Sequence, residues 1–207
     1  MPRSTRDNSS MPALFETPRL TIRHATVSDA DVAFFLRLWN NPQVMHFVGF
    51  PQGLGLDEAQ VRRAIQRGLE QGEPQHLDAR LVAERKLDGA SIGECKLGTP
   101  DAQGLSETDV KLLPEYWSQG YGVEIKRGLL TYLFTQTRCQ VVQATPNVEN
   151  IASIRMQEAV GGVRVGETVY EFPPEKRAFT CPVHSYIYQV RRETWELRRD
   201  RGGNAGA

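Results

Sequence analysis

The chain has 207 residues, and its 25 Lys and Arg residues are balanced by 25 Asp and Glu residues, so its formal net charge at pH 7 is zero. A chain of this length can bury enough surface to fold without a disulfide or a metal, and its charge balance does not indicate nucleic acid or an anionic membrane as a partner. No stretch approaches the roughly 20 apolar residues of a membrane span, so we expect a soluble protein.

Cysteine is sparse. Cys95, Cys139 and Cys181 lie about forty residues apart, and none belongs to a Cys-x-x-Cys pair. This spacing predicts neither a disulfide scaffold nor a metal site. Residues 1–13 are polar and lack the apolar core of a signal peptide. We therefore expect a protein of the reducing cytoplasm that uses no metal.

The two ends differ in composition from the rest of the chain. Residues 1–15 are rich in Ser, Pro, Asp and Arg, which is typical of a disordered segment. Residues 198–207 form a basic, Gly-rich end that we expect to be a flexible tail. The sequence therefore predicts a single domain over residues 16–197.

Apolar periodicity and turn residues predict the elements of the first half. A capping box at Ser28 begins the first helix, Asp88-Gly89 is a hairpin signal, and the consecutive Leu112 and Leu113 break an alternation, which marks a bulge or a strand end. The predicted strands are 19–24, 79–84, 91–97 and 108–113, and the helices run over 28–40 and 57–72.

The second half alternates helices with strands. We predict helices over 121–137 and 150–160, the second ending at Gly161-Gly162, and strands over 139–145, 163–170 and 184–190. The full order implies an α/β layer fold whose first half is largely antiparallel.

The most informative segment is 114–124, PEYWSQGYGVE. A strand ends, a Gly-containing turn follows and a helix begins, so free backbone N–H groups and the positive end of the helix dipole meet at the turn. Gly120 and Gly122 leave room for a ligand to approach. These features suit a phosphate, although a turn of this kind is more often purely structural.

A second segment, 147–153, lies between the next strand and the next helix. Asn150 is a good N-cap residue because its side chain can accept a hydrogen bond from a free helical N–H group. Ser153 follows one turn later on the same face. Capping alone is enough to explain this pair.

The two segments together resemble the GNAT acetyltransferases. Pro-x-Tyr-Trp-x-x-Gly-Tyr-Gly-x-Glu, followed by Asn-x-x-Ser and a Gly-ended helix, is similar to the Rim-type branch, the ribosomal-protein N-terminal acetyltransferases. Residues 16–23 resemble the opening strand of that branch, and Tyr188 with Arg191, Glu193 and Trp195 resembles its closing strand. The resemblance covers 16–195 and implies a mixed, mostly antiparallel central sheet of about six to seven strands flanked by four helices (α+β).

The resemblance also implies residue roles toward acetyl-CoA, the expected cosubstrate. Leu112 and Leu113 would present backbone groups to the pantetheine arm and polarise the thioester carbonyl. Asn150 would bind the pantetheine, and Ser153 would lie near the sulfur and protonate the departing thiolate. The CoA pyrophosphate would be held by the backbone N–H groups of Ser118, Gln119, Gly120, Tyr121 and Gly122.

The sequence departs from the family pattern at three positions. Trp117 stands where many relatives have Arg or Gln, although the Rim-type branch tolerates an aromatic residue there. Gln157 stands where many relatives carry a tyrosine acid, and Gly162 replaces a phenylalanine. The identity of the catalytic acid is therefore open.

Acetyl transfer needs an amine that has lost a proton, a stabilised thioester oxygen and a proton for the thiolate. We expect direct attack without an acyl-enzyme, because no cysteine lies in the motifs. Glu94 is the candidate general base, with Glu107 and Asp109 as alternatives. Candidates for the acceptor site, each also explained by packing or surface exposure, are Trp39, Met45, His46, Phe47, Phe50, His184, Tyr186 and Tyr188.

The sequence thus predicts an enzyme that acetylates a primary amine, with a protein or peptide α-amine as the favoured acceptor. Two alternatives stay open. The acceptor could be a small molecule such as an amino acid, a polyamine or an aminoglycoside, and the protein could bind acyl-CoA without turnover or serve as a structural protein. A homodimer is one option for its assembly.

Overall fold

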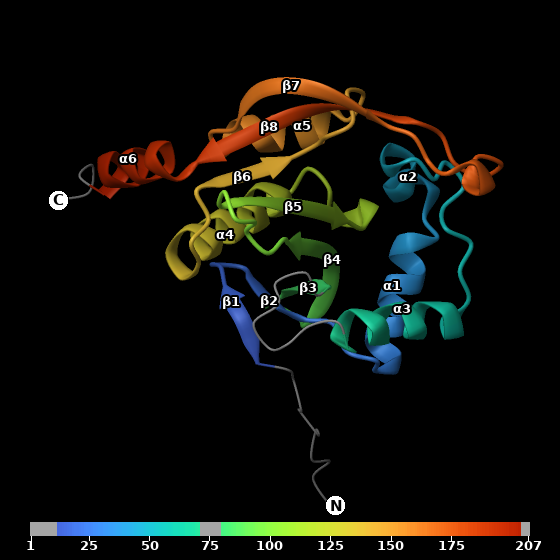
Figure 1. Cartoon of the computed structure of the whole chain (residues 1–207). Helices are drawn as coiled ribbons and strands as arrows, with labels where there is room; N and C mark the ends of the chain where they lie inside the picture. The colour runs from blue at the N-terminus through green and yellow to red at the C-terminus, as the bar shows by residue number, and fades with distance from the viewer. Residues whose placement is uncertain (1–11, 71–79, 204–207) are drawn as a thin grey trace, which may run out of the picture.

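The computed structural model describes residues 12–70 and 80–203. Its centre is an eight-stranded sheet in the order β1-β2-β3-β4-β5-β6-β8-β7 (Figure 1). Neighbouring strands are antiparallel except β5 and β6, which are parallel. The strands are β1 (Ala13–Glu16), β2 (Leu20–His24), β3 (Leu81–Arg85), β4 (Ala90–Leu97), β5 (Leu105–Leu112), β6 (Val141–Ala144), β7 (Val163–Tyr170) and β8 (Val183–Arg191).

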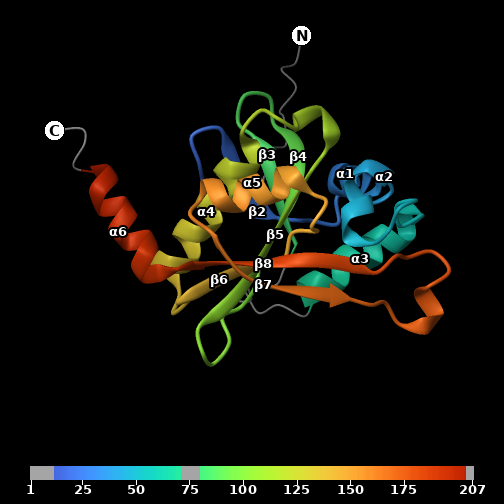
Figure 2. The same cartoon turned by 90° about the horizontal axis from the view of Figure 1, so that it is seen from above.

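Helices cover both faces of the sheet, with α4 and α5 on one side and α1, α2 and α3 on the other (Figure 2). The predicted cap at Ser28 is confirmed, because its side chain accepts a hydrogen bond from the Asp31 N–H. At the start of α3, Asp57 exchanges hydrogen bonds with Gln60. The helices are α1 (Asp29–Trp39), α2 (Pro42–Met45), α3 (Glu58–Glu70), α4 (Tyr121–Gln136), α5 (Ile151–Ala159) and α6 (Arg192–Gly203), with short 3-10 turns η1 (His46–Val48), η2 (Pro114–Tyr116) and η3 (Pro174–Lys176).

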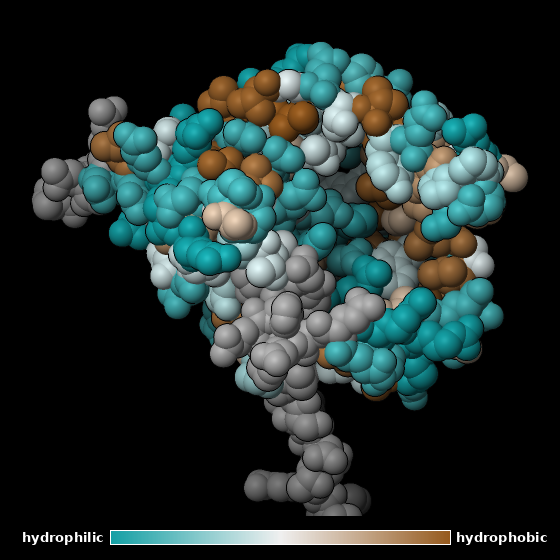
Figure 3. Space-filling model, viewed as in Figure 1, coloured by the Kyte–Doolittle hydropathy of each residue, from teal (hydrophilic) through white to brown (hydrophobic). Residues whose placement is uncertain are grey.

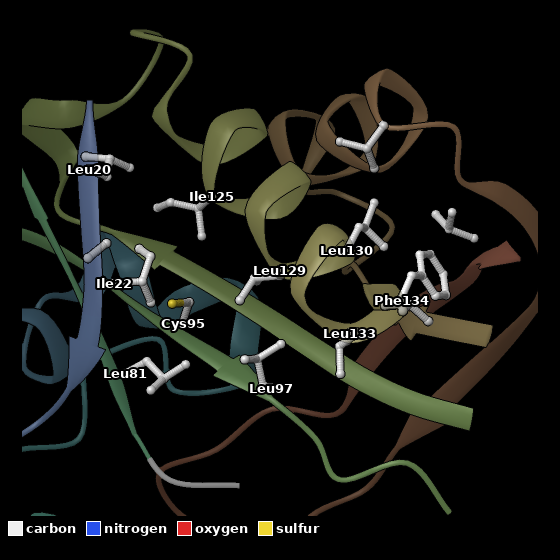
Figure 4. Packing of buried hydrophobic residues seen from close by; sticks show 14 of the residues in the cluster. Leu20, Ile22, Leu81, Cys95, Leu97, Ile125, Leu129, Leu130, Leu133 and Phe134 are labelled. Atoms are coloured by element: carbon white, nitrogen blue, oxygen red, sulfur yellow. The ribbon is translucent and has the colours of Figure 1, made fainter. Parts of the chain in front are cut away.

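Two apolar clusters, one on each face of the sheet, hold the layers together. Leu81 and Ala83 face the cluster that contains α4, whereas Val82 faces the cluster that contains α1 and α3. This alternation is what a strand with both faces covered requires. Figure 4 shows side chains from β2, β3 and β4 meeting Leu129 and Leu133 of α4.

The sheet opens between β5 and β6. These strands pair only from Leu105↔Val141 to Glu107↔Gln143, while β5 stays paired with β4 as far as Leu112. From Thr108 onward β5 therefore diverges from β6. We call this opening the wedge.

Three expectations about the ends of elements are wrong. Residues 13–15, expected in the disordered segment, belong to β1, because they pair with β2 and Phe15 packs against Tyr132 of α4. Residues 198–203, expected in the flexible tail, continue α6, in which the Arg199 guanidinium lies 5.0 Å from the Trp195 ring. Residues 45–48, expected to begin a loop, form the end of α2 and η1, whereas the expected helix stop at Asn40-Asn41-Pro42 is confirmed by the end of α1 at Trp39. Residues 1–11, 71–79 and 204–207, which carry other predictions, lie outside the described residues.

Candidate functional site

The loop that joins β5 to α4 has a backbone conformation suited to an anion. Ser118 has φ of 58° and Gly120 has φ of 79°, and Ser118 is the only non-glycine with positive φ among the described residues. Gly120 is the N-cap of the 16-residue helix α4 and its carbonyl accepts from Glu124. The N–H groups of the first turn therefore have no partner within the helix, and the helix dipole adds positive charge there.

Two side chains brace this loop. The Trp117 indole Nε1 donates to the carbonyl of Leu112 at 2.8 Å, and Gln119 Nε2 donates to the carbonyl of Glu115 at 2.7 Å. The Trp117 bond ties the loop to the last residue of β5, so the loop and the wedge are held in one arrangement.

An ion pair from the start of the chain lies against the same loop. The Arg19 Nε lies 2.6 Å from Glu124 Oε2, and Arg19 Nη1 donates to the carbonyl of Gln119 at 3.1 Å. The guanidinium also lies 4.3 Å from the centre of the Tyr121 ring. A cation therefore stands beside the candidate phosphate site. The sequence analysis assigns no role to this ion pair. The only hint in the sequence is that Arg19 and Glu124 each lie in a segment that resembles the family.

Every second residue of β5 directs its backbone N–H and C=O groups toward the wedge. The Leu113 N–H donates to Ile92 and the carbonyl of Glu107 accepts from Gly98, so the odd positions are bonded to β4. In an antiparallel pair the intervening positions direct their backbone groups to the other side. The backbone N–H of Leu112 thus points to the wedge, whereas the N–H of Leu113 already donates to the carbonyl of Ile92.

The break at Leu112-Leu113 is a strand end. The β4–β5 register runs without a shift from Gly93↔Leu112 to Leu97↔Thr108. Of the two residues expected to polarise the thioester carbonyl, only Leu112 has its N–H directed at the wedge. Leu113 is buried instead in the cluster with α1 and α3.

Asn150 and Ser153 lie at the start of α5, next to the first turn of α4. The Asn150 side chain accepts from the Ser153 N–H at 3.0 Å, as its predicted capping role requires. The two helices approach closely, because a Cβ at Gly122 would lie 3.1 Å from the sulfur of Met156. The start of α5 therefore shares one corner of the molecule with the phosphate-type loop.

The departures at Gln157 in α5 and at Gly162 just after this helix have structural explanations. Gln157 is buried, at 4% exposed, so its side chain belongs to the packing beneath α5 and does not line the surface. Gly162 donates its N–H to the carbonyl of Gln157, and a Cβ on Gly162 would lie 2.7 Å from that oxygen. A phenylalanine does not fit at this turn.

Glu94 lies on the opposite face of the sheet, at 6% exposed. Its Oε2 accepts from the Trp39 indole at 3.0 Å, and its Oε1 accepts from Arg80 Nη1 at 2.7 Å. The Arg80 guanidinium stacks 4.4 Å from the centre of the Trp39 ring. The candidate base is therefore an organised, hydrogen-bonded carboxylate on the face that α1 covers.

The other candidate bases lie on β5. The Asp109 carboxylate is ion-paired with Lys111 Nζ. Burial raises the pKa of Asp109, but the charge and hydrogen bond of Lys111 lower it more, so its net pKa lies below the ordinary value. Glu107 is exposed and accepts from Gln143 at 3.3 Å.

Loops from both halves of the chain meet across the α1 side of the wedge. Asn147 Nδ2 donates to the carbonyl of Phe47, the Cys181 N–H donates to that of Gly49, and the Phe50 and Phe172 rings lie 5.0 Å apart. The surface is hollowed inside this rim, between β8 and the α1–α2 region (Figure 3).

Several expected acceptor residues serve other contacts. Tyr188 donates to Glu158 of α5, His184 bonds Glu167 of β7, and Tyr186 lies under Arg164. Trp39 and Met45 are buried in the α1 cluster. Of the expected acceptor residues, Phe47 and Phe50 lie at the rim of the hollow. The neighbouring His46 ring lies 5.2 Å from that of Phe47.

The described residues offer neither a metal centre nor a membrane-spanning helix. No group of three or more His, Cys, Asp or Glu side chains there could hold a metal ion. None of the helices in residues 12–70 and 80–203 is long and apolar enough to cross a membrane.

Solved structures share this fold. Spermidine N-acetyltransferase from Vibrio cholerae, in complex with CoA and spermine, superposes with a TM-score of 0.68 at 20% identity, covering 86% of this chain and 98% of that one. The aminoglycoside acetyltransferase AAC(6')-Ib, in complex with coenzyme A, gives a TM-score of 0.65 at 19% identity, covering 87% and 99%. At these identities the likeness concerns the fold alone.

Sequence comparisons lead to the family. An uncharacterized N-acetyltransferase, p20 of Bacillus licheniformis, is 25% identical over 151 residues, which are 72% of this chain and 82% of that protein. YkkB of Bacillus subtilis is 27% identical over 143 residues, 68% of this chain and 80% of that protein. The family model for the acetyltransferase (GNAT) domain matches residues 19–163, well over half of the chain. The chain belongs to the GNAT family and is an acetyl-CoA-dependent N-acetyltransferase.

Proposed function

We propose that the protein transfers the acetyl group of acetyl-CoA to a peptide or protein α-amine by direct attack in a ternary complex. One observation carries the cofactor part of the proposal, namely the loop with Ser118 and Gly120 at positive φ that begins α4 and is tied to the wedge by Trp117. This arrangement joins an anion cradle to a strand with free backbone groups. These are the two parts that a thioester with a pyrophosphate requires.

The cofactor would lie along β5. Its pyrophosphate would accept from the backbone N–H groups of Ser118, Gln119, Gly120, Tyr121 and Gly122. Its pantetheine arm would run beside Asn150 to the wedge, and the Leu112 N–H would donate to the thioester oxygen. Such a preorganised donor stabilises the charge that develops on that oxygen.

In the reaction the amine nitrogen forms a bond to the acetyl carbon, and the carbon–sulfur bond breaks. The amine proton would pass to Glu94 through a water, because each Glu94 oxygen already accepts a hydrogen bond and keeps a further lone pair. The Ser153 hydroxyl would give a proton to the thiolate and regain one from solvent. An α-amine suits this step because its pKa of about 8 is well below that of a lysine amine, at about 10.4.

The acceptor proposal rests on the Rim-type resemblance. The solved relatives named above were determined with spermine or belong to an aminoglycoside enzyme, so a small-molecule amine is the competing candidate. An acceptor panel with free thiol as the readout separates them. A peptide α-amine should give the highest kcat/KM, and preference for a polyamine, an aminoglycoside or an amino acid would overturn this choice.

A substitution in the loop tests the cofactor site. Gly120→Glu places a carboxylate beside the expected pyrophosphate and should abolish the thermal shift given by acetyl-CoA. Gly89→Glu is the matched control, because Gly89 also has positive φ, at 72°, and a side chain there enters open space. Saturating acetyl-CoA at a hundred times its Kd should add about 2.7 kcal/mol of stability to the control and to the native protein. An unchanged shift in Gly120→Glu would contradict the assignment.

The two catalytic assignments are tested by kinetics. Ser153→Ala should lower kcat more than it weakens acetyl-CoA binding if the hydroxyl protonates the thiolate. Glu94→Gln should lower kcat by roughly 10²–10⁴-fold if the carboxylate takes the amine proton. A loss of stability with unchanged kcat would instead assign Glu94 to packing.

We also propose that two copies associate through the β7 edge. Val163, Val165 and Val169 are each more than half exposed on this strand. An exposed apolar edge strand can pair with its own copy in a two-fold arrangement. Light scattering should give a dimer that Val165→Lys converts to a monomer, and a monomeric native protein at micromolar concentration would refute the idea.

A cytoplasmic location is proposed on the state of the thiols. Cys95, Cys139 and Cys181 are free, and Cys181 is exposed. An exposed free thiol is stable in a reducing compartment. Recovery of the protein outside the cytoplasm on cell fractionation would contradict this location.

A further inference from the structure

One lysine lies between two carboxylates beside the wedge. The Lys111 Nζ is ion-paired with Asp109 and lies 3.7 Å from Glu94 Oε2. Lys111 directly precedes Leu112, and its side chain is 18% exposed. This cation therefore stands next to the point where the thioester is proposed to bind.

The three side chains project from the face of the sheet that the amine must use. Val110 and Leu112 pack into the cluster with α4, so Asp109 and Lys111, which alternate with them, point to the opposite face. Glu94 lies on that same face, bonded to Trp39 of α1. If the cofactor's pyrophosphate lies at the start of α4, the acceptor reaches the wedge from the α1 side.

The charges on this face are nearly balanced. Lys111 serves both carboxylates, and Arg80 makes a second ion pair with Glu94 at 2.7 Å. Glu107, the other carboxylate of β5, accepts a hydrogen bond from Gln143 at the root of the wedge.

Lys111 is a stable part of this arrangement. Burial lowers its pKa, but the charges of Asp109 and Glu94 raise it more, and the net pKa lies above the ordinary lysine value. The lysine therefore keeps its charge at neutral pH. A cationic ligand would have to displace the Lys111 ammonium group from these two carboxylates.

We propose that the Lys111 ammonium neutralises the Glu94 and Asp109 carboxylates and thereby restricts the acceptor to amines with a single positive charge. The inference rests on the proposed function and extends it, because it names the charge class of the acceptor. Polyamines and aminoglycosides carry several ammonium groups and need unpaired carboxylates. Here the Glu94 and Asp109 carboxylates are paired with cations of the same chain, which acts against such ligands.

The test is a selectivity ratio measured on the full chain. The native enzyme should acetylate an uncharged-side-chain peptide α-amine with at least about tenfold higher kcat/KM than spermidine. Lys111→Met vacates the carboxylate pair, so the ratio should shift toward spermidine by about tenfold or more. Lys111→Arg keeps the charge and should retain the native preference. Lys86→Met, which removes a lysine paired with Glu16 far from the wedge, should leave the ratio unchanged.

A binding measurement separates this inference from the catalytic proposal. Without cofactor, spermidine should raise the melting temperature of Lys111→Met and leave that of the native protein unchanged. Arg80→Met, at a half-exposed position, should show a smaller gain of the same sign and serves if Lys111→Met does not fold. A native enzyme that prefers spermidine, or variants that gain no spermidine binding, would overturn the role of Lys111. Absence of acetyl transfer with normal spermidine binding to Lys111→Met would count against the proposed function alone.

Discussion

The indole Nε1 of Trp117 donates a hydrogen bond to the backbone carbonyl of Leu112 across 2.8 Å. Trp117 belongs to the loop that is proposed to hold the pyrophosphate, and Leu112 is the residue whose N–H faces the wedge. The bond therefore couples the position of the anion cradle to that of the proposed oxyanion donor. It also explains why an aromatic residue with an N–H donor can stand where many relatives have Arg or Gln.

Trp117→Phe tests this coupling. The ring is kept but its donor is lost, and a neutral hydrogen bond contributes about 1 kcal/mol, so we expect acetyl-CoA affinity to fall by roughly fivefold. Isothermal titration calorimetry gives the Kd directly. Trp195→Phe in α6, which packs on Phe134 away from the loop, is the control. Equal affinity in native protein and Trp117→Phe would show that the bond does not position the loop.

Ser118→Gly tests the backbone strain in the loop. A serine at φ of 58° is in the left-handed region that favours glycine. We expect the variant to unfold at higher urea concentration, with a gain of up to about 1 kcal/mol, because the strain is removed. Acetyl-CoA binding should be retained, since the N–H group remains. A less stable variant would mean that the serine hydroxyl makes a compensating interaction.

Glu124→Gln tests the ion pair that anchors the first turn of α4. Burial raises the pKa of Glu124, but the hydrogen bonds from Thr17 and Arg19 lower it more, and the net pKa lies below the usual value. A lowered folded-state pKa stabilises the protein above the unfolded pKa, and this contribution is lost as the pH falls through the folded value. We therefore expect Glu124→Gln to lose about 1–3 kcal/mol at pH 7 and the deficit to shrink below about pH 4.

Chemical denaturation across this pH range checks the Glu124 prediction. The exposed Glu58→Gln at the start of α3 should change stability little at any pH. A Glu124→Gln deficit of constant size from pH 7 to pH 3 would attribute the loss to packing rather than to the charge.

Lys126→Met tests a buried amine in the α4–β5 interface. Lys126 is 2% exposed and its Nζ donates to Thr108 Oγ1. Burial lowers its pKa to about 7, a shift that the charge of Asp109 partly opposes. The unfolded chain then binds more protons than the folded chain between about pH 7 and pH 10.5, so native stability rises across this window. The variant lacks the free-energy cost of burying a charged amine. Its gain in melting temperature should therefore be largest near pH 6 and shrink toward pH 10.

A second substitution isolates the effect of the Lys126 charge. Thr108 loses its partner in Lys126→Met, which leaves a buried hydroxyl at a cost of about 1–3 kcal/mol. Thr108→Val in the same background should recover that cost at every pH. A gain that does not depend on pH would mean that the amine is not titrating in the folded protein.

The sequence by itself determined the order of the main elements, the two motif segments and the family resemblance, because these depend on local periodicity, on caps such as Asn150, and on turn residues such as Gly120. It also predicted the N-cap bonds of Ser28 and Asn150, since each is made within one helical turn. Local signals did not reveal β1, which is short and depends on pairing with β2. They also did not reveal α6, which contains Glu193 and Trp195, two residues expected in the closing strand.

Only the tertiary structure decided which of these residues share a site. The ion pair between Arg19 and Glu124 joins positions 105 apart in the chain. Leu112 rather than Leu113 has an N–H directed at the wedge because the Leu113 N–H is hydrogen-bonded to β4. The grouping of Glu94, Arg80 and Lys111 likewise comes from strand register and from the packing of α1. Such contacts depend on how strands pair and helices pack across the whole chain, and no local pattern of residues encodes that pairing.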